Sequence, residues 1–199
     1  MVRGWTAAIC IFSASAATAV EAASSIDIGA AAKSWAPQFV LTGTKTEPTY
    51  VEHIRLERDG ALFVLQGGAP AGMPSSREVV VIDADGSLRH IECPAAMRCD
   101  NTEPPSGFLA SAAIVAAIGR GRLSGFFQAF SYGSYRLVCV SAEKLGVREA
   151  ILDPCVEIRS GAVMALRHRM SGQFEGPSLD PWSINISTRK SAAAFSANQ

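Results

Sequence analysis

The stretch SGFLASAAIVAAIGRG, Ser106–Gly121, decides the fold, because it is the only long helical-looking apolar run after the N-terminal segment. Phe108–Ile118 carries no charge, and alanines surround its bulkier Leu, Ile and Val side chains. Ser106 is a typical N-cap, and the closing Gly-Arg-Gly is typical of a helix end. A run of about eleven residues covers roughly 16 Å, which is too short to cross a bilayer. We therefore expect a buried helix under a sheet, and not a membrane-inserting or partner-docking helix.

The chain begins with a segment that has the layout of a secretory signal peptide. Met1–Ala22 carries an early positive charge at Arg3, then an uncharged stretch, then small residues suited to cleavage. An uncleaved anchor is the alternative. A lipidated cysteine directly follows a small residue, whereas Cys10 follows Ile9, so we do not expect lipidation. The sequence predicts a periplasmic or secreted protein whose mature chain has no transmembrane span.

Charge and length limit the class of protein. The chain has 18 basic and 18 acidic residues, so it lacks the overall basic excess that favours nucleic-acid binding. A local cluster, Arg167–Arg169, is left as a possible anion contact. The predicted mature chain has about one domain's length. We expect a loosely ordered lead-in over 23–45, a single α+β domain over 46–189 and a disordered tail over 190–199.

Four cysteines follow the predicted signal peptide, which in an exported chain indicates two disulfides. Among the three possible pairings, local spacing favours Cys93–Cys99 and Cys139–Cys155. The alternative is a metal site made from His90, Cys93 and Cys99. Its spacing lacks the paired short-loop ligands of a zinc site, so we expect neither metal nor cofactor.

The remaining pattern is rich in strands. Each of three expected hairpins has two strand-like runs around a short turn with a glycine, at Asp59-Gly60, Ala84–Gly86 and Ser160-Gly161. Further strands are expected at 37–42, within 124–142 and over 181–188, where Trp182, Ile184 and Ile186 share one face. The paired runs of the hairpins are 49–58 with 61–66, 77–83 with 87–93, and 150–159 with 162–170.

Together these elements predict an α+β fold in which a curled antiparallel sheet, resembling a half-barrel, packs around one central apolar helix. At the level of topology alone, this arrangement resembles the half-open barrels of periplasmic carriers and related envelope proteins. The resemblance rests on element order and carries little functional weight.

Catalytic signatures are weak, and no catalytic residue is expected. Ser141 and Lys144 have the S-x-x-K spacing, but the S-D-N and K-T-G companion motifs are absent. We expect His53 and His90 to face solvent and His168 to be a partly buried core residue with a backbone partner. Asp83–Gly86 resembles part of a calcium loop but is better explained as a hairpin turn. The catalytic candidates, if any, are Ser141, Lys144, His168 and His90.

Aromatic and methionine side chains after the helix are candidates for lining an apolar pocket. The sequence favours a non-enzymatic cell-envelope or secreted module that binds an apolar or amphipathic ligand or an envelope protein. The alternatives are an exported serine hydrolase and a purely structural envelope-assembly domain. The pocket candidates are Phe126, Phe130, Tyr132, Tyr135, Met164 and Met170.

Overall fold

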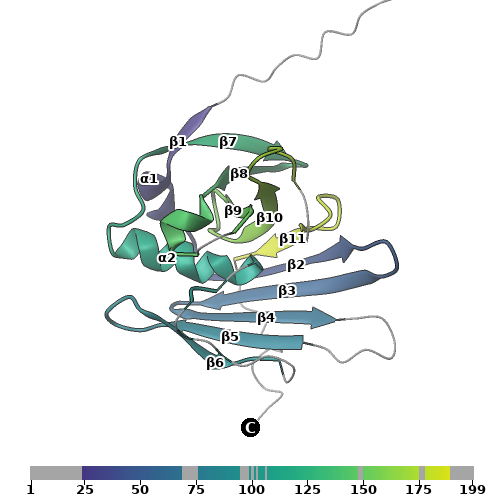
Figure 1. Ribbon diagram of the computed structural model, residues 1–199, viewed down its shortest axis with the longest axis horizontal. Helices are drawn as coiled ribbons and strands as arrows, with labels where there is room; N and C mark the ends of the chain where they lie inside the picture. Colours follow the sequence, from purple (N-terminus) through teal and green to yellow (C-terminus); the bar gives the residue numbers. More distant parts are fainter. Residues whose placement is uncertain are drawn as a thin grey trace, which may run out of the picture.

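The computed structural model describes residues 24–68, 76–94, 99, 101, 103–105, 107–147, 150–174 and 178–188. These residues form two antiparallel sheets, with the longest helix, α2, lying between them (Figure 1). The larger sheet has strand order β11-β2-β3-β4-β5-β6, and the smaller has β1-β7-β8-β9-β10. The chain is thus mostly strand, in an α+β arrangement.

The larger sheet is a meander to which the last strand is added. Two of its turns are the expected ones, since Gly60 and Gly86 have φ of 60° and 81°, which glycine adopts without strain. Gly86 closes the turn that resembles a calcium loop, where the Gly86 amide donates to the Asp83 carbonyl at 2.8 Å. The strands are β2 (Gln38–Thr46), β3 (Val51–Asp59), β4 (Leu62–Gly68), β5 (Ser76–Ile82), β6 (Leu88–Glu92) and β11 (Asn185–Ser187).

The smaller sheet contains the third expected hairpin, formed by β9 and β10. At the turn of this hairpin, Glu157 is buried, and its carboxylate accepts hydrogen bonds from the Arg159 and Ser160 amides at 3.0 and 2.8 Å. This carboxylate therefore fixes the turn from within the core. The strands are β1 (Ser25–Asp27), β7 (Phe126–Tyr132), β8 (Tyr135–Cys139), β9 (Leu152–Glu157) and β10 (Val163–His168).

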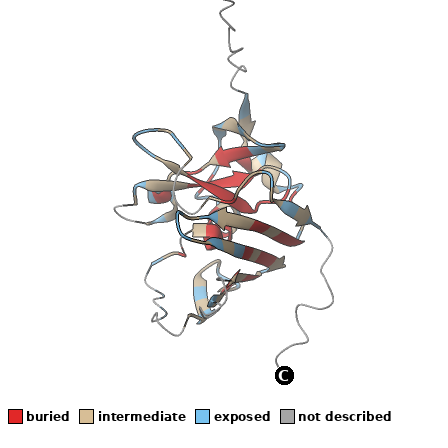
Figure 2. Cartoon of the chain, turned by 90° about the vertical axis from the view of Figure 1, so that its right-hand side faces the viewer, coloured by how far each residue is buried: buried red, intermediate tan, exposed pale blue. Residues whose placement is uncertain are grey.

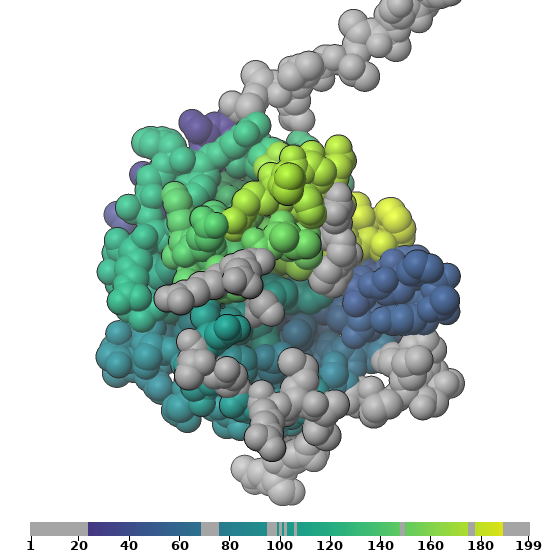
Figure 3. Space-filling view, viewed as in Figure 1, coloured from purple at the N-terminus to yellow at the C-terminus, as the bar shows by residue number. Residues whose placement is uncertain are grey.

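The first and last strands each belong to the sheet that is built mainly from the opposite half of the chain. The early strand β1 pairs with β7, and the late strand β11 pairs with β2. Just before β11, Asp180 accepts hydrogen bonds from the hydroxyls of Thr44 and Thr46 at 2.9 and 2.8 Å. Figure 3 shows this yellow segment above the blue end of the β2–β3 hairpin. The two sheets are therefore tied together at both ends.

The deciding stretch forms a 3-10 turn η1 (Gly107–Leu109) followed by α2 (Ala110–Gly119). The helix is buried along most of its length, as expected, and it ends where the glycines predict, with Gly121 at φ 67°. The Ser111 hydroxyl donates to the Phe108 carbonyl and accepts from the Val163 amide, both at 2.8 Å. The bond from the Val163 amide attaches α2 to β10. The expected N-cap, Ser106, lies outside the described residues.

The expectation of one curled sheet around the helix is wrong, because the structure has two separate sheets. The reason is in the pairing: after α2 the chain does not extend the sheet at β6 but starts a second one at β7, which pairs with β1. Buried residues, red in Figure 2, gather where the two sheets face each other. The helix is therefore the middle layer between two sheets.

The stretch 23–45, expected to be a loose lead-in, instead contains β1, the short helix α1 (Ile28–Ala32) and most of β2. Asp27 caps α1 by accepting from the Gly29 amide at 2.9 Å, and Ile28 is buried. The Trp35 indole donates to the Ile158 carbonyl at 2.9 Å. The apolar residues of the stretch 23–45 lack a regular period in the sequence, so the sequence alone does not show that distant partners bury them.

The last strand is shorter than expected. Only Asn185–Ser187 pairs with β2, whereas 181–183 form a turn and Trp182 is exposed. Ile184 and Ile186 pack against the core as predicted. The predicted signal peptide and the tail over 190–199 lie outside the described residues.

Both predicted disulfides are confirmed, Cys93–Cys99 and Cys139–Cys155. They are consistent with an extracellular or otherwise non-cytoplasmic location. Among the residues that the structure describes, no helix combines the length and apolarity that a bilayer crossing needs.

Candidate functional site

An apolar cavity of about 360 Å³ lies beside the first turn of α2. Its walls come from η1, from the short 3-10 helix η2 (Ala142–Leu145) and from the β9–β10 hairpin. None of the described side chains that line it carries a charge, and the volume falls within the roughly 300–1,000 Å³ typical of small-molecule sites. The lining residues are Pro105, Gly107, Ala110, Ala142, Leu145, Val147, Ala150, Ile151, Leu152, Pro154 and Leu166. We call this space the apolar cavity.

Charged groups next to the apolar cavity hold its walls in place. The Arg169 guanidinium bonds to Glu143 at 2.6 Å and to Asp153 at 3.1 Å, and these carboxylates raise its pKa, Asp153 most. Asp153 also accepts from the Ala142 amide at 3.0 Å. These contacts fix η2 against β9, and with it the side chain of Leu145.

A second cavity, of about 320 Å³, continues along the same helix. Leu145 lines both cavities, and Pro104 and Pro105 border one each. This second space has polar and charged walls, and we call it the charged cavity. Its charged lining residues are Glu103, Arg120, Arg122, Glu143 and Lys144.

A larger depression of about 590 Å³ lies over the end of the six-stranded sheet where β2 to β5 meet. Two arginines on it, Arg55 and Arg77, are already paired with Glu57 and Glu92. Since their charges are neutralised by neighbours on the same sheet, this depression offers a weaker binding site than the two cavities beside α2.

The catalytic candidates do not form a recognisable catalytic group among the described contacts. The Ser141 hydroxyl accepts from Arg169 at 3.4 Å, whereas the Lys144 ammonium lies 4.9 Å from the centre of the Phe127 ring. His168 is half-buried, and its Nδ1 accepts from the Ser171 amide at 3.2 Å. This backbone partner is the one predicted for His168.

His53 is exposed as expected, but the expectation for His90 is wrong. The His90 side chain is only 9% exposed, and its Nδ1 lies 3.1 Å from a Glu78 oxygen. Burial raises the pKa of Glu78, and the nearby imidazole partly opposes that shift. His90 pairs with Val80 on the face that packs on the core, because Leu88 and not Ile91 points inward on β6.

The alternative of a metal site at His90, Cys93 and Cys99 is also overturned, because the two sulfur atoms are bonded to each other. Within the described part of the chain, no group of three or more His, Cys, Asp or Glu residues is placed to hold a metal ion.

The predicted pocket residues are not brought together around either cavity. Phe126 is 75% exposed and Met170 is 90% exposed, whereas Met164 is fully buried. The Tyr132 and Tyr135 hydroxyls instead donate to backbone carbonyls of the segment before β11. Phe130 lies edge-on to Phe174, and the Arg167 guanidinium carbon lies over the Phe130 ring, 4.3 Å from its centre. These aromatic side chains attach segments to each other.

Sequence reasoning missed both cavities because their walls come from separate segments without a shared motif. One signal was available in α2 itself. Ala110, Ala113, Ala117 and Arg120 are spaced so that they lie on one helix face, and small side chains there leave space beside the helix.

Comparison with protein-family models, with curated proteins and with solved structures finds no match to this chain.

Proposed function

We propose that this protein is an exported, non-enzymatic module, periplasmic or secreted, that binds an apolar or amphipathic small molecule in the apolar cavity. The observation that carries the proposal is that the described residues lining that cavity are uncharged, with Leu145, Leu152 and Leu166 among them. Burying apolar ligand surface there is favourable by about 25 cal/mol per Å². The two disulfides agree with export.

A protein partner that inserts an apolar side chain is the second candidate. Ile151 lines the apolar cavity and is exposed, and its carbonyl accepts from the Arg169 amide at 2.9 Å. Met170 is the next residue after Arg169, and its side chain is almost wholly exposed. Two exposed apolar side chains so close to an apolar cavity favour a contact with another surface.

The proposal is tested by titrating the purified protein with the neutral apolar dye N-phenyl-1-naphthylamine, whose fluorescence rises on transfer out of water. We expect saturable binding to one site. Ala150 lines the cavity and is only half-buried, so Ala150→Phe should fill the space without disturbing the core. This variant should weaken dye binding at least tenfold.

The matched control is Ala30→Phe, which makes the same change on the exposed side of α1. Its dye affinity should equal that of the parent protein, and both variants should retain the parent's thermal unfolding temperature within a few degrees. Absence of saturable dye binding by the parent, or equal affinity of the Ala150→Phe variant, would overturn the proposal.

A further inference from the structure

The two cavities follow one face of α2 from its first turn to its end. Ala110 lines the apolar cavity, Ala113, Ala117 and Arg120 line the charged cavity, and these four positions share a helix face. At 1.5 Å per residue, Ala110 and Arg120 are separated by about 15 Å along the helix axis. The cavities therefore follow each other along the helix, and Leu145 lines both of them.

The two ends of this path differ sharply in charge. The described residues lining the apolar cavity carry no charge, whereas Arg120, Arg122 and Lys144 line the charged cavity. Two carboxylates share that lining, but Glu143 is already bonded to Arg169 at 2.6 Å. Among the lining residues that the structure describes, Glu103 is then the acidic side chain left to balance three cations. The charged cavity therefore favours an anion.

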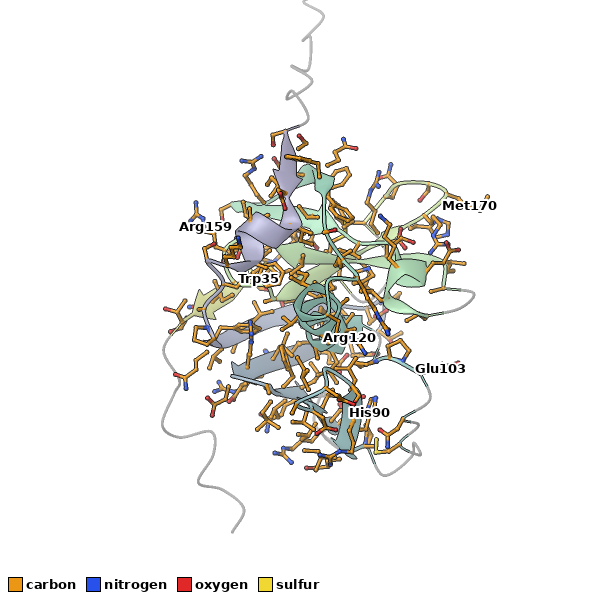
Figure 4. All side chains as sticks on the ribbon, turned by 90° about the vertical axis from the view of Figure 1, so that its left-hand side faces the viewer. Trp35, His90, Glu103, Arg120, Arg159 and Met170 are labelled. Atoms are coloured by element: carbon orange, nitrogen blue, oxygen red, sulfur yellow. A yellow bond between two sulfur atoms is a disulfide. The ribbon has the colours of Figure 1, made fainter. Side chains whose placement is uncertain are left out.

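The three cations differ in how they are held. The stem of Arg120 packs on Gly86, where an added Cβ would lie 2.8 Å from the Arg120 Cγ, and Asp85 on that turn lies near its charge. Arg122 and Lys144 are exposed, and no ion pair is formed by either within the described part of the chain. Figure 4 shows Arg120 by the end of α2, and Glu103 lines the same cavity. Arg122 and Lys144 are thus the cations that no described carboxylate holds, and the Lys144 ammonium lies 4.9 Å from the centre of the Phe127 ring.

We infer that the ligand is a single-chain anionic amphiphile, with its apolar chain in the apolar cavity and its anionic head beside Arg120, Arg122 and Lys144. This assignment rests on the proposed function and adds the sign of the head group and the direction of the chain along α2. Charge complementarity selects an anionic head over a neutral or cationic one.

The test compares dodecanoate, dodecanol and dodecyltrimethylammonium, each below its critical micelle concentration, as competitors of the bound naphthylamine dye. The double variant Arg122→Gln/Lys144→Gln removes the two exposed cations and leaves Arg120, whose stem is part of the packing. We expect it to weaken dodecanoate binding about five- to tenfold at low salt, the sum of two exposed charge contacts. Its affinity for dodecanol should not change.

The matched control is Lys33→Gln/Arg159→Gln, which removes the same charges from exposed positions. Figure 4 shows Arg159 far from Arg120, near Trp35. We expect this control to keep the parent's dodecanoate affinity. Equal weakening in both double variants would overturn the inference, since only overall charge would then matter.

Two further outcomes separate this inference from the proposed function. If dodecyltrimethylammonium competes as well as dodecanoate, the head-group assignment is overturned while the apolar site stands. If neither the dye nor any of the three amphiphiles binds saturably, the proposed function itself is overturned, and the head-group assignment with it.

Discussion

Replacing Ser111 with alanine tests how the central helix is attached to the smaller sheet. Ser111 is fully buried, and its hydroxyl donates to the Phe108 carbonyl and accepts from the Val163 amide. Val163 is itself fully buried in β10. The Ser111→Ala variant leaves the Val163 amide without this partner in a place that water does not reach.

The size of the effect is set by two opposing contributions. An unsatisfied buried amide costs about 1–3 kcal/mol of unfolding free energy. Alanine is the better helix former by about 0.5 kcal/mol, which offsets part of that cost. We therefore expect a net loss of about 1.5 kcal/mol, equivalent to about 3–6 °C in the melting temperature of a chain of this size.

Urea unfolding followed by circular dichroism measures the loss, and amide hydrogen exchange at Val163 reports on the bond itself. Exchange at Val163 should accelerate in the variant more than exchange at other β10 amides. The control is Ser134→Ala, at an exposed position in the turn between β7 and β8. A Ser111→Ala loss under about 0.3 kcal/mol with unchanged Val163 exchange would refute the reasoning, given the cost of a lost buried bond.

Two further predictions concern the smaller sheet and the disulfides. Replacing both cysteines of one disulfide with alanine should lower the free energy of unfolding by about 3 kcal/mol for Cys139–Cys155 and about 2 kcal/mol for Cys93–Cys99. The first loss is larger because Cys139–Cys155 closes the longer loop. The reverse order of the two losses in urea unfolding would contradict this prediction. Burial raises the pKa of Tyr132, so its stabilising contribution is complete below the ordinary tyrosine pKa of about 10 and is lost as pH rises further. The Tyr132→Phe variant should therefore lose less unfolding free energy than the parent between pH 9 and 11, because it lacks this one titrating group. Identical dependence of the unfolding free energy on pH in the two proteins would contradict this prediction.

The hairpins and the end of the helix were predictable because local chemistry determines them. Gly60, Gly86 and Gly121 adopt positive φ where the turns and the helix end require it. The disulfides were predictable from spacing, because neighbouring strands bring Cys139 opposite Cys155. In each case the cause lies within a few residues of the effect or in a single hairpin.

The two-sheet arrangement was not predictable because it depends on very short strands with distant partners. Ile26 pairs with Phe127 and Ile186 pairs with Leu41, and three residues carry no measurable period. His90 shows the same limit on a smaller scale, since alternation along β6 does not say whether Leu88 or Ile91 faces the core. Only the opposing sheet and α2 decide which face is buried.

The candidate site was missed at the sequence level for a different reason, although the alanine spacing of α2 was a signal for it. Aromatic residues attract attention as pocket candidates, yet here Tyr132 and Tyr135 bond to backbone, and the cavities lie beside alanines of α2. Larger apolar side chains on that helix face would fill the space and add about 0.8 kcal/mol for each buried methylene group. The Ala142 amide donates a hydrogen bond to Asp153, and this bond holds η2 on the opposite wall against β9. The fold therefore does not need the cavities for its stability, and the spacing of small residues on α2 leaves space between the helix and η2, where we propose that a ligand binds.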